Sequence, residues 1–392
     1  MKKMLRFFKV LLIIIASCAA LVYGGVFLAH KVIFPIKTAH VPTSGAVTDG
    51  RLTLGVQAHA VQPTDIEGYI EILARQLKRY NEVAPELWPD NTLTDQSLII
   101  EGIRGNKFWL ITPDGAIKPL SKTAALGYGI KRLAYFNGFS LFDGGMYLAV
   151  SEEDITNYLI FQNYLHLGTY DAFITFAHEG FHITQQPKWQ VMSHIPNRER
   201  NGFLDNIPAR ATRALLQKQL LQAVSEPGNI QLILEALATY DDWKTKFPEE
   251  CKNSVYFDRV EGTAFYYELI SCLYAAYPEQ ISNGGDLDQA LALLATREDI
   301  YIKHGLIAEG YTVGGFSCVL LNRLESGWQE QLINDAQATP AELLFKHFAE
   351  ETLPAPQQLS QAGLDAVSAE INTPAVNRGK PLFFRVLYDM LF

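Results

Sequence analysis

The chain has 392 residues, of which 48% are hydrophobic and 19% are charged. This composition is typical of a folded protein with a large core in one or two domains, and it excludes a disordered chain. The formal net charge of −9 and the lack of a basic patch beyond the N-terminus argue against a nucleic-acid partner.

The first 40 residues predict a membrane anchor. Val10–Ala29 contains 20 residues without a charge, which matches a helix crossing a hydrocarbon core of about 30 Å. More basic residues precede this segment than closely follow it, and this asymmetry places the N-terminus in the cytoplasm. We therefore expect residues 1–40 to form a single-pass anchor. The main domain is then expected outside the cytoplasm, in the periplasm if the cell is Gram-negative.

A lipid anchor is the alternative. Ile15–Cys18 (IASC) resembles a bacterial lipobox, in which Cys18 would carry the lipid after cleavage of the preceding signal segment. The apolar run continues beyond Cys18, which favours the uncleaved helix. Both interpretations tether the same domain to a membrane.

Residues 41–150 predict a linker, one helix and a small sheet. Thr64–Val83 has apolar residues at helical spacing, with Thr64 as its N-cap and with Pro85 and Pro89 ending it. Short runs of β-branched and aromatic residues between turn sequences then predict a mainly antiparallel sheet. Its strands are expected in SLIIEGI (97–103), KFWLIT (107–112), AIKPL (116–120) and MYLAV (146–150).

Residues 151–392 predict a larger helical region, so the fold class is α+β. Within this region Cys272 and Cys318 lie among apolar residues, and we expect them to be core residues rather than a disulfide. The closing Pro381–Phe392 is too short to span a membrane and is expected to pack in the core. Helical hydrophobic spacing covers residues 171–186, 208–224, 229–247, 259–277, 287–304 and 310–324.

The motif with the clearest chemistry is HEGFH. His178 and His182 stand four residues apart in an apolar segment, so on a helix they share one face about 5–6 Å apart. Two imidazoles at this spacing can bind one Zn²⁺, and Glu179, one step round the helix, can accept a proton from water. The apolar residues before the motif indicate a buried helix and thus a dry site.

A catalytic zinc needs a third protein ligand. Glu261 and Glu268 lie seven residues apart in an apolar helical segment, so they fall on one helix face. A buried carboxylate is costly unless it is paired or bound to a cation. We expect Glu261 to be the ligand, because Gly262 and Ala264 beside it leave room for another helix, and Glu268 to orient an imidazole. The reverse assignment stays open.

HEGFH followed by VEGTAFYYE resembles the zincin metallopeptidases, and specifically the gluzincins. In these enzymes an H-E-x-x-H helix supplies two zinc ligands and the general base, and a later helix supplies a glutamate. The E-G-x-A form of the second segment is similar to that of several poorly characterised zinc-dependent peptidase families. No third histidine follows at the metzincin spacing. The resemblance implies a Zn²⁺ held by His178, His182 and Glu261, with Glu179 as the general base.

The resemblance also implies an edge strand that lies along the cleft and pairs with an extended substrate. MYLAV, the last strand before the HEGFH helix, is the candidate, and the alternative is that it is an ordinary core strand. Attack on a carbonyl creates an oxyanion, so a hydrogen-bond donor is expected beside the metal. Tyr311 is the first candidate for this donor, and the alternatives are His304, Tyr266 and Tyr267.

The sequence therefore predicts a membrane-anchored zinc metallohydrolase that acts on a peptide or protein substrate. One alternative is a non-catalytic envelope binding or scaffold domain with a structural metal, but such sites commonly use four ligands that include cysteine. Another is a di-iron carboxylate protein, which would need a second E-x-x-H helix that the sequence lacks.

Overall fold

The computed structural model describes residues 65–102, 107–130, 138–150, 171–190, 192, 194–196, 203–277, 281 and 284–372. All of them belong to one unit of the chain, residues 52–392. Among these residues no helix has the length and apolar character needed to cross a bilayer. The predicted anchor, the lipobox with Cys18, the linker before residue 64 and the closing Pro381–Phe392 lie outside the described residues.

The first described helix is α2 (Ile66–Leu87), and its N-cap lies one residue later than predicted. The carboxylate of Asp65 accepts a hydrogen bond from the backbone N–H of Gly68 at 2.8 Å, so the prediction of Thr64 as the N-cap was wrong. Aspartate is the stronger capping residue of the two. Pro85 lies inside the last turn of α2, and the helix ends two residues later. A proline removes one backbone donor from the helix, so a helix end close to it is expected.

Five strands form one mixed sheet in the order β3-β2-β1-β5-β4, which confirms the small sheet expected from the sequence. Three pairings are antiparallel, whereas β1 and β5 run parallel. A parallel pairing requires a long connection between the two strands, and here β2, β3 and β4 all lie between them in the chain. The strands are β1 (Ser97–Gly102), β2 (Lys107–Ile111), β3 (Ile117–Leu120), β4 (Gly138–Phe142) and β5 (Gly145–Val150).

Strand β5, which contains MYLAV, lies in the interior of the sheet. Leu148 is opposite Ile100 of β1 on one side and Phe139 of β4 on the other. Of the two alternatives for MYLAV, the edge strand was therefore wrong and the core strand is confirmed. The hairpin at Gly144, whose φ is 90°, folds β4 back along β5 and makes β4 the edge. Every residue of β5 is buried, and a continuous apolar run of this kind is typical of a strand covered on both sides.

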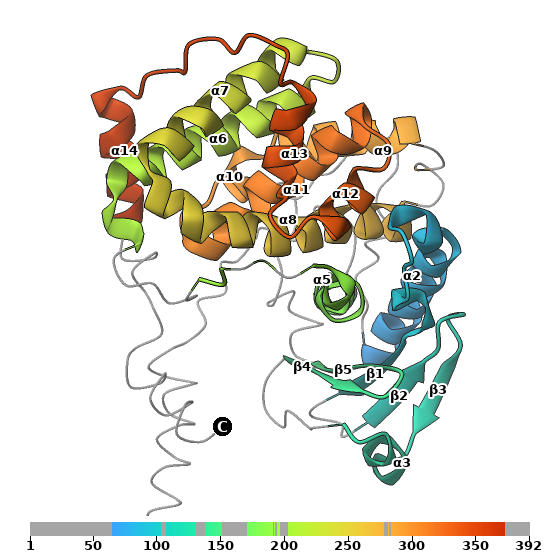
Figure 1. The fold of residues 1–392 in the computed structure, drawn as a ribbon. Helices are drawn as coiled ribbons and strands as arrows, with labels where there is room; N and C mark the ends of the chain where they lie inside the picture. The colour runs from blue at the N-terminus through green and yellow to red at the C-terminus, as the bar shows by residue number, and fades with distance from the viewer. Residues whose placement is uncertain are drawn as a thin grey trace, which may run out of the picture. The chain divides into compact units, whose positions relative to one another are not determined.

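The two faces of the sheet belong to separate cores. Ile100 and Leu148 point to the face packed against the helical part. Ile99 and Ala149, which alternate with them, point to the other face, where α3 (Lys122–Gly127) covers the sheet with Ala125. Figure 1 shows α3 and α2 on opposite sides of the sheet.

The helical part follows the sheet in the chain, so the α+β class is confirmed. Its longest described helix, α8 (Pro248–Ala276), contacts α2, α5 (Asp171–Thr184) and α11 (Leu306–Leu324), and α5 also contacts β5. Figure 1 shows α5 between the sheet and α8. The single helix predicted at 287–304 is interrupted and forms α9 and α10. The remaining helices are α6 (Ile207–Ser225), α7 (Ile230–Lys246), α9 (Gly284–Ala295), α10 (Glu298–Tyr301), α11 (Leu306–Leu324), α12 (Trp328–Asn334), α13 (Pro340–His347) and α14 (Gln361–Asn372).

Glycines allow α8 and α11 to approach each other closely. A Cβ added to Gly262 on α8 would lie 2.4 Å from the Cα of Gly314 on α11, and a Cβ on Gly310 would lie 2.8 Å from the backbone of Phe257. Larger residues would clash at these points, because a backbone can approach this closely only where there is no side chain. The room expected beside Glu261 is therefore occupied by α11.

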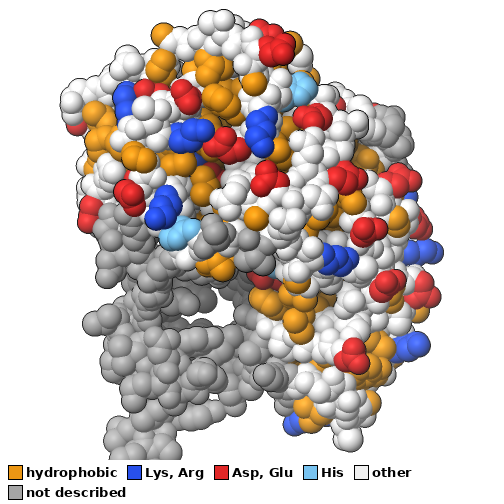
Figure 2. All heavy atoms as spheres, viewed as in Figure 1, with side chains coloured by type: hydrophobic (Ala, Val, Ile, Leu, Met, Phe, Trp, Pro, Cys, Tyr) orange, Lys and Arg blue, Asp and Glu red, His pale blue; other side chains and the backbone are white. Residues whose placement is uncertain are grey.

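A buried cluster of charges ties α6 to α8 and α11. Arg213 donates two hydrogen bonds to the carboxylate of Asp258 (2.6 and 3.1 Å), and Arg210 donates one to Glu309 (2.6 Å). These four side chains have no exposed surface. On the face of the molecule shown in Figure 2, basic and acidic side chains are interspersed. The buried pairs fix the three helices relative to one another, since each charge is stable only opposite its partner.

The three described cysteines outside the predicted anchor, Cys251, Cys272 and Cys318, are all free and buried. Cys272 and Cys318 have no exposed surface and belong to the main hydrophobic core. The expectation that they are core residues rather than a disulfide is confirmed.

Candidate metal centre

Helix α5 presents both histidines of HEGFH to α8. The ring centroids of His178 and His182 lie 4.8 Å apart, and their Nε2 atoms are separated by 3.2 Å. Gly180, between them in the sequence, faces Leu93, since a Cβ there would lie 2.5 Å from a Leu93 methyl carbon. Leu93 can therefore pack directly against the α5 backbone. The two histidines therefore lie on one face of α5, as predicted, and their Nε2 atoms point towards each other.

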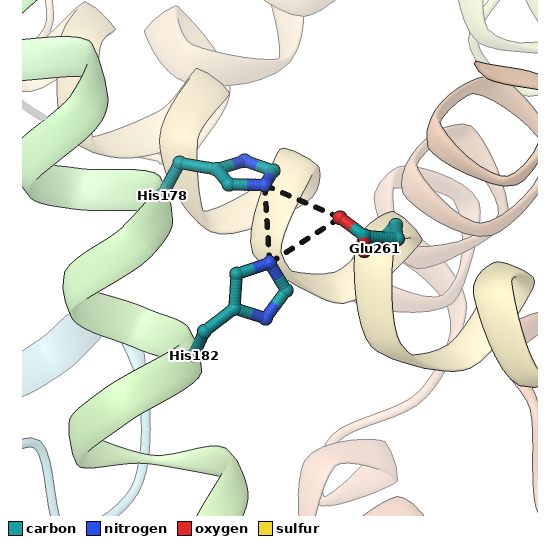
Figure 3. Close-up of side chains that lie close together, drawn as sticks. All are labelled: His178, His182 and Glu261. Carbon is teal, nitrogen blue, oxygen red and sulfur yellow. Dashed lines mark hydrogen bonds and ion pairs between the residues drawn. The ribbon is translucent and has the colours of Figure 1, made fainter. Parts of the chain in front are cut away.

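Glu261 on α8 points its carboxylate at these two nitrogens. Its Oε2 lies 3.5 Å from Nε2 of His178 and 3.3 Å from Nε2 of His182 (Figure 3). Glu261 is 4% exposed and His178 is 7% exposed. Within the part of the chain that the structure describes, these three residues form the one group of histidine, cysteine and acidic side chains able to hold a metal ion.

The dimensions of this triangle fit a small tetrahedral ion. A tetrahedral Zn²⁺ with bonds of about 2.0–2.1 Å separates its ligand atoms by about 3.3 Å. The three ligand-atom separations are 3.2, 3.3 and 3.5 Å, so each is close to that value. Two imidazoles and a carboxylate are also the ligand types that catalytic zinc uses when it keeps a fourth position open.

Glu268 contacts the other nitrogen of His178. Its Oε2 lies 2.9 Å from Nδ1 of that ring, and Glu268 is 3% exposed. Glu268 lies two turns along α8 from Glu261, so the two carboxylates hold His178 at opposite ring nitrogens. The structure therefore places Glu261 with the two Nε2 atoms and Glu268 behind one of the rings, as the sequence analysis expected of an orienting residue.

The electrostatics of the site favour a positive charge at its centre. Burial by itself lowers the pKa of His178, but the hydrogen bonds to Glu261 and Glu268 outweigh it and raise this pKa to about 10. Burial tends to raise the pKa of Glu261, but the two imidazoles hold it well below its usual range. Burial also raises the pKa of Glu268. In the absence of an ion, a proton on His178 supplies the cation that these carboxylates require.

Glu179 and Tyr311 lie beside the same imidazole. Glu179 is half-buried, and its charge contributes to the raised pKa of His178. The ring of Tyr311, on α11, meets the ring of His178 edge to face with centroids 5.5 Å apart. The structure therefore brings the predicted general base and the first candidate for the oxyanion donor to the imidazole of His178.

The alternative oxyanion donors have partners elsewhere. The Nε2 of His304 pairs with a glutamate on α14 at 3.4 Å. The hydroxyl of Tyr267 lies 2.5 Å from that of Tyr80, and Tyr266 is buried in the main hydrophobic core. Of the four candidates, the ring contact with His178 belongs to Tyr311.

One residue of the site was missed by the sequence analysis. Gln186 follows α5 in the short 3₁₀ helix Gln186–Lys188, and its Oε1 lies 2.7 Å from Nδ1 of His182. Its position four residues after His182 on the same helical path was the signal that could have indicated it.

No family model, no curated protein and no solved structure matches this chain. Its function is therefore inferred from the arrangement of its own residues.

Proposed function

We propose that this protein is a zinc-dependent hydrolase that cleaves peptide bonds. The observation that carries the proposal is the triangle of His178, His182 and Glu261, whose edges of 3.2, 3.3 and 3.5 Å match a tetrahedral zinc site. The support is the combination of this geometry with Glu179 on the same helix, which is the residue order of the H-E-x-x-H motif.

The side chains have distinct roles in this proposal. His178, His182 and Glu261 would hold the ion, which when bound supplies Lewis acidity and lowers the pKa of a water ligand towards about 7. Glu179 accepts the proton that the attacking water gives up, and later delivers it to the leaving amine. Tyr311 donates a hydrogen bond to the oxyanion that forms when the carbonyl is attacked.

An extended peptide is the proposed substrate, and β4 is the proposed strand that receives it. Because β5 is an interior strand, we assign the peptide-binding role to its neighbour β4. Among the described strands, β4 pairs with β5 alone and so lies at the edge of the sheet. Backbone hydrogen bonds from such an edge can bind a peptide irrespective of most of its side chains. Attachment to a membrane through Val10–Ala29 is part of the proposal and rests on that segment's uncharged length.

A purely structural metal is less consistent with these residues. Structural zinc sites are closed by four protein ligands, whereas the cluster in the described residues provides three, and none of them is a cysteine. A ligand set of this size leaves one position for water or substrate, which is the condition for catalysis.

The proposal is tested by metal content and activity together. The full-length protein should contain one zinc per chain, and the His178→Ala/His182→Ala double variant should contain none. His347→Ala is the matched control, because His347 lies on α13 and pairs with Glu325 at 3.3 Å. Stoichiometric zinc retained by the double variant would exclude the site.

Activity is tested with Glu179→Gln, using a casein digest or a fluorogenic peptide library to detect hydrolysis. The amide keeps the shape of Glu179 but cannot accept a proton, so zinc should be retained while the rate falls at least ~10²-fold. Glu235→Gln, at another half-buried helical glutamate, should keep wild-type activity. Hydrolysis by Glu179→Gln at the wild-type rate would remove Glu179 from the role of base.

A further inference from the structure

Gln186 contacts both helices of the candidate metal centre. Its Oε1 lies 2.7 Å from Nδ1 of His182 on α5, and its Nε2 lies 2.6 Å from the backbone oxygen of Val260 and 3.1 Å from Oγ1 of Thr263, both on α8. Val260 and Thr263 stand on either side of Glu261 in the sequence. One half-buried side chain therefore joins an imidazole of the site to the segment that carries the carboxylate.

The contacts of Gln186 allow a single orientation of its amide. The hydroxyl of Thr263 donates to the backbone oxygen of Arg259 at 2.6 Å, so its oxygen is available to accept. The Nε2 group has two hydrogens, and Val260 and Thr263 provide two acceptors for them. Rotating the amide by half a turn would bring its oxygen to the backbone oxygen of Val260, where neither atom can donate.

The orientation of the amide determines the tautomer of His182. Because the amide oxygen is the atom that faces the ring, Nδ1 of His182 must carry the hydrogen and donate it. In a neutral imidazole Nε2 then has the free lone pair. That nitrogen is the one that lies 3.3 Å from Glu261 and 3.2 Å from Nε2 of His178. The hydrogen bond thus leaves His182 ready to bind a metal without further rearrangement.

We infer that Gln186 is a positioning residue that holds His182 in its metal-binding tautomer and fixes the distance between α5 and Glu261. This inference rests on the proposed zinc site and identifies a residue that acts through His182 rather than on the substrate. The two imidazoles are held differently, since Glu268 faces His178 with a carboxylate and Gln186 faces His182 with a neutral amide. An amide orients the ring without adding another buried negative charge to the site.

The test compares three variants of the full-length protein by the dissociation constant for zinc, measured in competition with a chromophoric chelator. Gln186→Met keeps the length of the side chain but removes its polar atoms, and affinity should fall about 10- to 100-fold, as when an outer partner of a ligating histidine is lost. Gln186→Glu keeps an oxygen that can accept from Nδ1, so it should bind zinc more tightly than the methionine variant.

Gln185→Met is the control for general damage at the end of α5. Gln185 is 1% exposed, and its amide contacts Asn91 rather than an imidazole. This variant should keep a zinc dissociation constant within about threefold of wild type. An equal loss of affinity in Gln185→Met and Gln186→Met would mean that Gln186 acts only as a structural residue, and the inference would be overturned.

The tautomer itself is read by two-bond ¹H–¹⁵N correlation NMR of the metal-free protein with ¹⁵N-labelled histidine. Wild-type His182 should have its hydrogen on Nδ1, and Gln186→Met should give a mixture of the two tautomers. An unchanged His182 spectrum in Gln186→Met would overturn the inference. A wild-type protein that binds no zinc would refute the proposed function instead, while the NMR measurement would still decide whether Gln186 sets the tautomer.

Discussion

Replacing Gly314 by alanine tests whether the close crossing of α8 and α11 positions the candidate metal centre. A Cβ at Gly314 would lie 1.8 Å from the backbone oxygen of Asp258 and 2.8 Å from the Cα of Gly262. Carbon and oxygen approach to about 3.3 Å at closest, so the two helices must separate locally by about 1.5 Å. Gly262 is next to Glu261, and a metal site tolerates changes in ligand distance of only about 0.2 Å.

The expected effects follow from that separation. Overpacking of this kind costs about 1–3 kcal/mol, which for a unit of this length corresponds to a fall of about 1–4 °C in the midpoint of thermal unfolding. The zinc dissociation constant should rise at least ~10-fold, because the carboxylate of Glu261 moves relative to the two imidazoles.

Circular dichroism on heating and chelator competition provide the two measurements. Gly284→Ala is the matched control: Gly284 is also helical, but a Cβ there would have nothing within 4 Å. This substitution should leave zinc binding and the midpoint of thermal unfolding unchanged. If Gly314→Ala melted and bound zinc like the wild type, the close crossing would have no part in forming the site. If Gly314→Ala lost stability but kept wild-type zinc affinity, the close crossing would contribute to core packing and not to the geometry of the site.

Two further predictions concern the carboxylates of α8. Glu261→Ala should abolish zinc binding, whereas Glu268→Ala should weaken it about 10- to 100-fold; equilibrium dialysis distinguishes them, and the reverse pattern would assign the ligand role to Glu268. Arg213→Met should destabilise the fold by about 3–5 kcal/mol, since it removes the cation that faces the fully buried carboxylate of Asp258. The double variant Arg213→Met/Asp258→Leu should recover most of this loss in denaturant titrations. Wild-type stability of Arg213→Met alone would contradict the assigned pairing.

The local features of this fold could be predicted from the sequence because they depend on short spacings. The four-residue step from His178 to His182 places both rings on one helix face, and α5 has that face. The seven-residue step from Glu261 to Glu268 likewise placed both carboxylates on one side of α8, and both contact His178. Helical and alternating periodicities identified the main helices and the strands for the same reason.

The features that the sequence did not indicate depend on which elements become neighbours. The strand order decides that β5 is interior and β4 is at the edge, and no local pattern contains that order. The pairing of Arg213 with Asp258 joins residues 45 positions apart. The partners of Gln186 on α8 are 74 and 77 positions away. Polar side chains at such separations acquire a role only after the helices pack.

The packing of α8 explains why the proposed ion should be divalent. This helix buries Asp258, Glu261 and Glu268, and an ionised carboxylate is costly to bury unless a cation faces it. Arg213 of α6 faces Asp258, whereas Glu261 faces the imidazoles of His178 and His182, and Glu268 faces that of His178. A proton on His178 offsets one of these two negative charges. A divalent cation bound by neutral imidazoles offsets both and leaves Glu268 free to accept the hydrogen from Nδ1. The charges on this helix are therefore balanced by a metal ion more completely than by a proton.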